Sequence, residues 1–94
     1  MDKLMDADLS IALGQQIRSK SRQPFDNAYR AALVTPEARY IQGFLVIARH
    51  PFHPIEHAWL ELPNYLLDPS FSLLSCQAQQ LTYFPAHSLS LIHI

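Results

Sequence analysis

The chain has 94 residues, 49% of them hydrophobic, and a formal net charge of −1 at pH 7. This length predicts a single domain, residues 1–94, with a modest hydrophobic core. A charge this close to zero gives no electrostatic basis for binding nucleic acid or an anionic membrane. No apolar stretch approaches the length of a membrane span, so membrane insertion is not expected.

The cellular location is predicted from the cysteine count and the first residues. Cys76 is the only cysteine, which excludes an intramolecular disulfide. The opening segment MDKLMDADLS carries acidic residues, whereas a signal peptide has a basic start followed by a long apolar run. These features indicate a cytoplasmic protein.

Two helices are predicted in the first part of the chain. Residues 4–19 carry apolar side chains at helical spacing, with Gly14 as a weak point. Residues 24–33, PFDNAYRAAL, repeat the pattern more clearly, because Pro24 suits a first helical position and Thr35-Pro36 ends the run. The predicted apolar stripe of this second helix consists of Phe25, Ala28, Tyr29, Ala32 and Leu33.

Strands are predicted from residue 39 onward. The segment RYIQGFLVIARH is rich in β-branched and aromatic residues, and the proline-rich HPFHP then makes a turn. Further strands are predicted at 55–62, 65–67, 80–84 and 87–94, whereas residues 70–80 favour a short helix or a loop. Helices followed by several meandering strands predict an α+β fold, in which N-terminal helices pack on one face of an antiparallel β-sheet.

The strand at 55–62 carries the first residue with chemical potential, His57. Alternation places Ile55, His57, Trp59 and Glu61 on one face of the strand, and Glu56, Ala58, Leu60 and Leu62 on the other. If the His57 face meets the helices, the imidazole points towards the 24–33 helix, and Asp68 can accept its second N–H. The alternative is a partly buried histidine bonded to backbone, with Asp68 opening an Asp-Pro-Ser turn. Spacing alone favours this alternative.

Three segments in order, ARYIQGF, HAWLEL and LLDPSF, resemble the core of the transglutaminase-like, papain-related thiol enzymes. They are most similar to small bacterial and phage-type members, which read Tyr-x-x-Gly-Tyr, Pro-x-Glu-His-Ala-Trp and Asp-Pro-Thr and close with a Tyr-Phe segment like LTYFPA here. The similarity covers about residues 24–86. It implies a reduced papain-like core, with His57 as the base and Asp68 as the residue that orients it.

The same resemblance implies a nucleophilic cysteine at the start of the helix before the Gly-Phe strand. Pro24 occupies that position in the segment PFDNA. A cysteine at a helix N-terminus has its thiolate stabilised by free N–H groups and the helix dipole, and an adjacent imidazolium lowers its pKa further. Proline offers neither a nucleophile nor an N–H. The neighbouring Gln23 and Phe25 are equally unable to attack a carbonyl.

Cys76 and the other histidines provide weaker candidates for chemistry. Cys76 lies after Asp68 in SLLSCQAQQ, where no helix N-terminus activates it, and a free cysteine in such surroundings is usually a small buried hydrophobe. His50, His53 and His57 have a spacing that suits helical metal ligands, but Pro51 and Pro54 exclude a helix there. Neither a metal site nor a cofactor is therefore expected.

The leading hypothesis is a catalytically inactive transglutaminase-like domain that binds a protein or peptide in the residual cleft or along a sheet edge. A rival is a thiol hydrolase or acyltransferase that uses Cys76 or a nucleophile from a second chain. A third alternative is a small structural subunit of an assembly. The uncharged C-terminal segment HSLSLIHI predicts an edge strand, so a homodimer or a hetero-complex through residues 88–94 is also expected.

Overall fold

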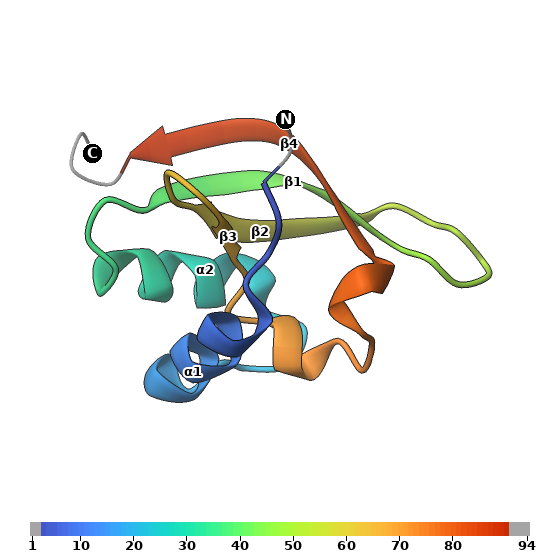
Figure 1. Ribbon diagram of the computed structural model, residues 1–94, viewed down its shortest axis with the longest axis horizontal. Coiled ribbons are helices and arrows are strands. Elements are labelled where there is room, and N and C mark those ends of the chain that lie inside the picture. Colours follow the sequence, from blue (N-terminus) through green and yellow to red (C-terminus); the bar gives the residue numbers. More distant parts are fainter. Residues whose placement is uncertain (1–2, 91–94) are drawn as a thin grey trace.

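Two helices pack on a four-stranded antiparallel sheet with strand order β3-β2-β1-β4 (Figure 1). The structure is a computed structural model, and it describes residues 3–90. In chain order the elements are α1 (Ala7–Ile17), α2 (Pro24–Leu33), β1 (Arg39–Ile47), β2 (Ile55–Glu61), β3 (Leu66–Leu67), the 3₁₀ helices η1 (Phe71–Leu73) and η2 (Ala78–Gln80), and β4 (Leu81–Ser90). The predicted α+β class is confirmed. Within residues 3–90, no helix has the length and apolar character needed to cross a membrane.

The helices begin and end where local chemistry favours it. The side chain of Asp6 accepts a hydrogen bond of 2.9 Å from the N–H of Leu9 and caps α1. α1 ends at Arg18, whose left-handed φ of 55° turns the chain away. Pro24 is the first residue of α2, as predicted, and no side chain caps that end.

The buried face of α2 differs from the predicted stripe. Asn27, Ala28, Ala31 and Ala32 are buried, whereas Phe25, Tyr29 and Leu33 of the predicted stripe are 38%, 48% and 61% exposed. The small alanine side chains allow the helix to approach the sheet closely. The prediction was therefore right for Ala28 and Ala32 and wrong for the larger residues.

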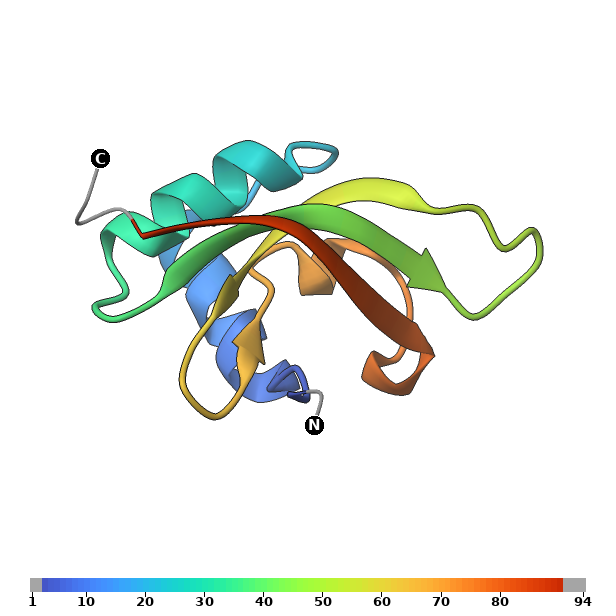
Figure 2. The same cartoon turned by 90° about the horizontal axis from the view of Figure 1, so that it is seen from above.

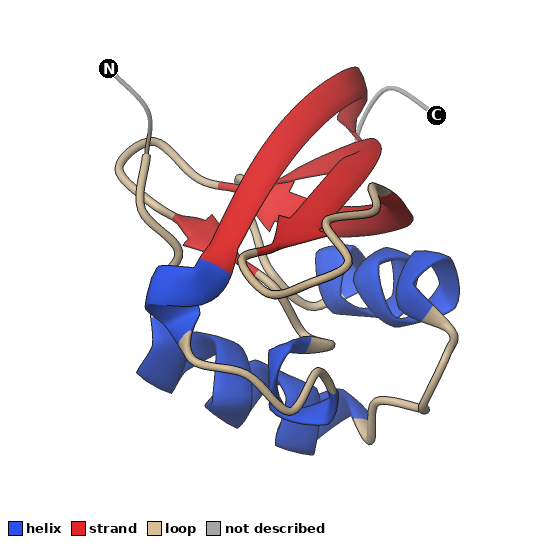
Figure 3. Cartoon of the chain, turned by 90° about the vertical axis from the view of Figure 1, so that its right-hand side faces the viewer, coloured by secondary structure: helices blue, strands red, loops and turns tan. Residues whose placement is uncertain are grey.

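The helices lie on one side of the strands (Figures 1 and 3). Ala28 of α2 packs with Tyr40 and Ala58 of the sheet, and a second cluster joins both helices to Leu60 and Leu67. The face of β2 that meets the helices is therefore the Ala58–Leu60 face, not the His57 face. His57 lies on the opposite face, where its ring is near those of Trp59 and Tyr83.

β1 and β2 continue into a hairpin that projects from the body of the molecule (Figure 2). Within the described residues, β3 pairs with β2 only at Leu60 and Glu61, so the His57 end of β2 lies at an open edge of the sheet. The chain between α1 and α2 and the segment that contains η1 meet at this edge. Their meeting point forms the site described below.

β4 is one continuous edge strand, not the two strands predicted at 80–84 and 87–94. Its pairing with β1 shifts between Gln42 and Gly43, which leaves Ala86 as an extra residue. The bulge lets a single strand run through Pro85. Gly43 is required at this point, because a Cβ there would lie 2.1 Å from the Phe84 carbonyl oxygen and 2.9 Å from the Trp59 ring. Residues 91–94 of the predicted last strand lie outside the described residues.

Candidate functional site

Asp68 lies at the centre of a buried polar cluster and directly follows β3. Its side chain is fully buried, and both carboxylate oxygens have partners. Oδ1 accepts the N–H of Ser70 at 2.9 Å, and Oδ2 accepts the Tyr83 hydroxyl at 2.7 Å. Oδ2 also lies 2.8 Å from Nε2 of His57. The backbone N–H of Asp68 donates to Oγ of Ser10 at 2.9 Å, which ties the cluster to α1.

His57 is only 2% exposed, and its contact with Asp68 was predicted from the sequence. An ionised Asp68 selects the ring form that carries a proton on Nε2. Nδ1 makes no hydrogen bond with the described residues. Every fully buried side-chain nitrogen or oxygen atom among these residues does have a partner, so Nδ1 is not one of the fully buried atoms. Nδ1 therefore keeps some contact with solvent, and His57 lines the pocket described below.

Tyr83 is the third member of the cluster, and it reaches Asp68 from β4. Burial raises the pKa of Tyr83 far above its ordinary value of 10, and the negative charge of Asp68 and the hydrogen bond to it raise it further. Tyr83 therefore acts as a neutral donor. Its role was not predicted, because only the fold brings residues 68 and 83 together.

Asn27 connects the site to the chain between the helices. Its side chain accepts the N–H of Lys20 and donates to the carbonyl oxygen of Lys20, both at 2.8 Å. It also donates to Oγ of Ser70 at 3.0 Å and accepts from Arg30 at 3.0 Å. Asn27 was missed by sequence reasoning. The sequence feature that could have indicated the role of Asn27 is its place, as a polar residue, among the alanines that α2 buries.

A pocket of about 390 Å³ separates His57 from the start of α2. Pro24 and His57 both line it, so the structure brings together the two positions that the family resemblance implies. The other lining residues come from the segment before α2, from β2 and from the segment around η1: Lys20, Ser21, Arg22, Gln23, Ile55, Ser70, Leu73 and Leu74. The start of α2 presents a proline ring to this pocket, and proline has no group that attacks a carbonyl.

Cys76 is not among the residues that line this pocket. Burial raises the pKa of its thiol, and the positive charge of Arg49 opposes this effect only in part. Cys76 is therefore not an activated thiolate. Among residues 3–90 no group of three histidine, cysteine, aspartate or glutamate residues is arranged to hold a metal ion.

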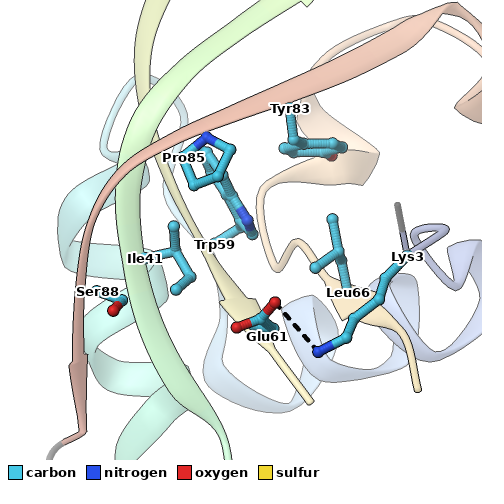
Figure 4. A pocket seen from close by; sticks show the side chains of 8 residues that line it. All are labelled: Lys3, Ile41, Trp59, Glu61, Leu66, Tyr83, Pro85 and Ser88. Carbon is cyan, nitrogen blue, oxygen red and sulfur yellow. Dashed lines mark ion pairs between the residues drawn. The ribbon is translucent and has the colours of Figure 1, made fainter. Parts of the chain in front are cut away.

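A second pocket, of about 340 Å³, lies on the His57 side of the sheet above Trp59 (Figure 4). Several of its polar side chains are paired with other residues. Glu61 binds Lys3 at 3.1 Å, Arg39 donates to Ser88 at 2.7 Å, and the Tyr83 hydroxyl binds Asp68. This pocket therefore combines an apolar surface with ion pairs and hydrogen bonds that already occupy several of its polar side chains.

Comparison with known proteins adds no relative to this description. No protein-family model matches the chain, and no curated protein or solved structure matches it significantly.

Proposed function

We propose that the protein is a catalytically inactive domain of the transglutaminase-like, papain-related kind, and that it binds a peptide segment of another protein in the pocket between Pro24 and His57. The observation that carries this proposal is a buried His57–Asp68 pair beside a helix that begins with proline. The pair has the arrangement of a base and its orienting residue. The residue that would use the base is absent.

The papain-like part of the proposal rests on three features of the site. A helix packs on an antiparallel sheet, and its first residue faces a histidine across a pocket. The histidine contacts an aspartate that follows the next strand. In a nucleophile–histidine–carboxylate arrangement, one ring nitrogen of the histidine faces the nucleophile while the other contacts the carboxylate.

Binding is favoured over catalysis by the surroundings of the available groups. Cys76 has a raised pKa and does not line the pocket, so a hydrolase or acyltransferase that uses it has little support. The pocket itself is well suited to binding, because it combines an apolar wall of Ile55, Leu73 and Leu74 with the accessible nitrogen of His57.

Selection from a random peptide library, followed by fluorescence anisotropy, tests the proposal. Selected peptides are expected to bind with micromolar affinity, and Leu73→Glu is expected to weaken binding at least about tenfold, because it places a charge on the apolar wall. Leu33→Glu is the matched control, since Leu33 is 61% exposed and lies outside the pocket. Failure to select any peptide, or equal loss in both variants, would contradict the proposal.

A further inference from the structure

Resting on the proposed function, we propose that the bound peptide is held by a carboxylate, and that Nδ1 of His57 recognises it by taking up a proton on binding. The favoured carboxylate is that of a peptide C-terminus with an apolar last residue. The pocket is then a site for an anion at the position that a thiolate occupies in the thiol enzymes.

His57 is the first reason. His57 is 2% exposed, yet among the described residues only its Nε2 has a hydrogen-bond partner. With Nε2–H directed at Asp68, neutral His57 presents a lone pair at Nδ1, which repels a carboxylate. A second proton turns Nδ1 into a charged donor. The imidazolium then lies between two anions, Asp68 and the ligand, so the ligand favours its formation.

The charges around the pocket are the second reason. Lys20 and Arg22 line it, and none of its lining residues is acidic. The nearest carboxylate on α2, that of Asp26, forms an ion pair with Arg30 at 2.9 Å. The start of α2 adds the partial positive charge of a helix N-terminus, since its first residue lines the pocket and no side chain in the described part of the chain caps it.

The backbone at this edge is held in place. Asn27 fixes both backbone groups of Lys20, and Arg22 has a left-handed φ of 61°, which is unfavourable for a non-glycine residue. Such conformations persist where the surrounding structure enforces them, and they gather at binding sites. The apolar side chains of Ile55, Leu73 and Leu74 complete the pocket beside these charges.

The charged and titratable groups that face His57 come from three elements. Asp68 follows β3 and lies 2.8 Å from Nε2 of the ring, while Tyr83 of β4 is neutral and binds the same carboxylate. Lys20 and Arg22 oppose a charged ring until an anion enters. Binding and protonation are therefore linked, and the linkage is measurable.

Three pools of octapeptides that end in leucine serve as probes. One has free carboxyl termini and no acidic residue, one has the same sequences with amidated termini, and one is amidated but contains an internal glutamate. Affinity capture on the intact protein with mass spectrometry measures enrichment. We expect the free-carboxylate pool to be enriched at least about tenfold over its amide. Enrichment of only the glutamate pool would support the same carboxylate chemistry from a side chain.

Titration calorimetry of an enriched peptide at pH 7, in two buffers of different ionisation enthalpy, then gives the number of protons that the complex takes up on binding. We expect net uptake that is lost in His57→Gln. His57→Gln removes a buried contact and can unfold the chain, so Arg22→Gln serves as a second variant. We expect Arg22→Gln to bind the peptide roughly threefold more weakly and with a smaller salt dependence. Arg49→Gln is its control, because Arg49 lies outside the pocket.

The outcomes separate the two proposals. Equal capture of the free-carboxylate and amidated pools, or binding without proton uptake, overturns the carboxylate inference while peptide binding stands. Capture of none of the three pools overturns both.

Discussion

The hydroxyl of Tyr83 donates a hydrogen bond of 2.7 Å to Oδ2 of Asp68, the same oxygen that lies 2.8 Å from Nε2 of His57. One carboxylate therefore connects an edge strand, the end of β3 and the histidine of β2. Because Asp68 is fully buried, each of these contacts compensates for its lost hydration. The cluster stabilises the fold and fixes the orientation of His57 at the pocket.

Tyr83→Phe is expected to lower the free energy of unfolding by about 2 kcal/mol at pH 7, because it removes a hydrogen bond to a charged group. The pKa of Tyr83 is raised in the folded protein. Above pH 10 the unfolded chain releases this proton while the folded chain keeps it. The contribution of Tyr83 to the free energy of unfolding is thus complete below pH 10. Above pH 10 this contribution falls by up to about 1.4 kcal/mol per pH unit.

Urea unfolding between pH 7 and 11 measures this effect. The stability difference between the wild type and Tyr83→Phe is expected to narrow above pH 10. Tyr29→Phe, at a position that is 48% exposed, serves as the control and is expected to change stability little. A difference that stays constant up to pH 11 would show that Tyr83 is not held in its neutral form.

Gly14→Ala is expected to destabilise the protein, although helix propensity alone predicts a gain of about 1 kcal/mol. A Cβ at Gly14 would lie 2.6 Å from the carbonyl oxygen of Pro69, so α1 or the segment after Asp68 must move. Overpacking of this kind costs about 1–3 kcal/mol. Ala12→Gly, at an exposed position of α1, measures how much the difference in helix propensity between alanine and glycine changes the free energy of unfolding. Greater stability of Gly14→Ala in urea would contradict the close approach.

Pro24→Cys is expected to create a reactive thiol in a Cys76→Ser background. The helix N-terminus and an imidazolium at His57 both stabilise a thiolate there, so its pKa is expected to lie at least about one unit below 8.5. Rates of alkylation by iodoacetamide across pH give the pKa. Adding His57→Gln is expected to bring it back towards 8.5. An ordinary pKa in Pro24→Cys itself would count against an inherited thiol site.

The order of the elements was predictable from the sequence because it depends on local patterns. The helix that starts at Pro24 and the long strand from Arg39 are both present. The ambiguous region 70–80 forms short 3₁₀ helices and turns, in agreement with the preference for a short helix or loop. The contact between His57 and Asp68 is present as the family resemblance implied, whereas spacing alone favoured a histidine bonded to backbone.

The choice of buried face was not predictable from hydrophobicity. The side chains of Phe25, Tyr29 and Leu33 are more hydrophobic than that of Asn27. Nevertheless Asn27 is buried and the other three are exposed. Its burial is compensated by hydrogen bonds to Lys20, which a sequence pattern does not reveal. Likewise, Gly14 was judged a weak point in a helix, whereas its lack of a side chain permits the contact with Pro69.

The edge of β4 supports a last prediction, that the protein associates through its C-terminal strand. β4 occupies the end of the sheet order, and within residues 3–90 it pairs with β1 alone. A bulge at Ala86 interrupts the pairing along this strand. Beyond the bulge, the described part of the strand continues to Ser90 without a charged residue other than His87. It therefore remains a candidate for adding a strand from a second copy or from a partner.

Light scattering of the full chain and of Leu91→Lys tests this idea, with Leu33→Lys as a control for an added charge on an exposed leucine. Leu91 lies outside the described residues, and the substitution places a charge in the segment predicted to extend the edge. A homodimer is expected for the wild type and for Leu33→Lys, and a monomer for Leu91→Lys, because a lysine on an edge strand opposes pairing with a second strand. A wild type that stays monomeric at every accessible concentration would defeat self-association, and β4 would then be left as a site for a different partner.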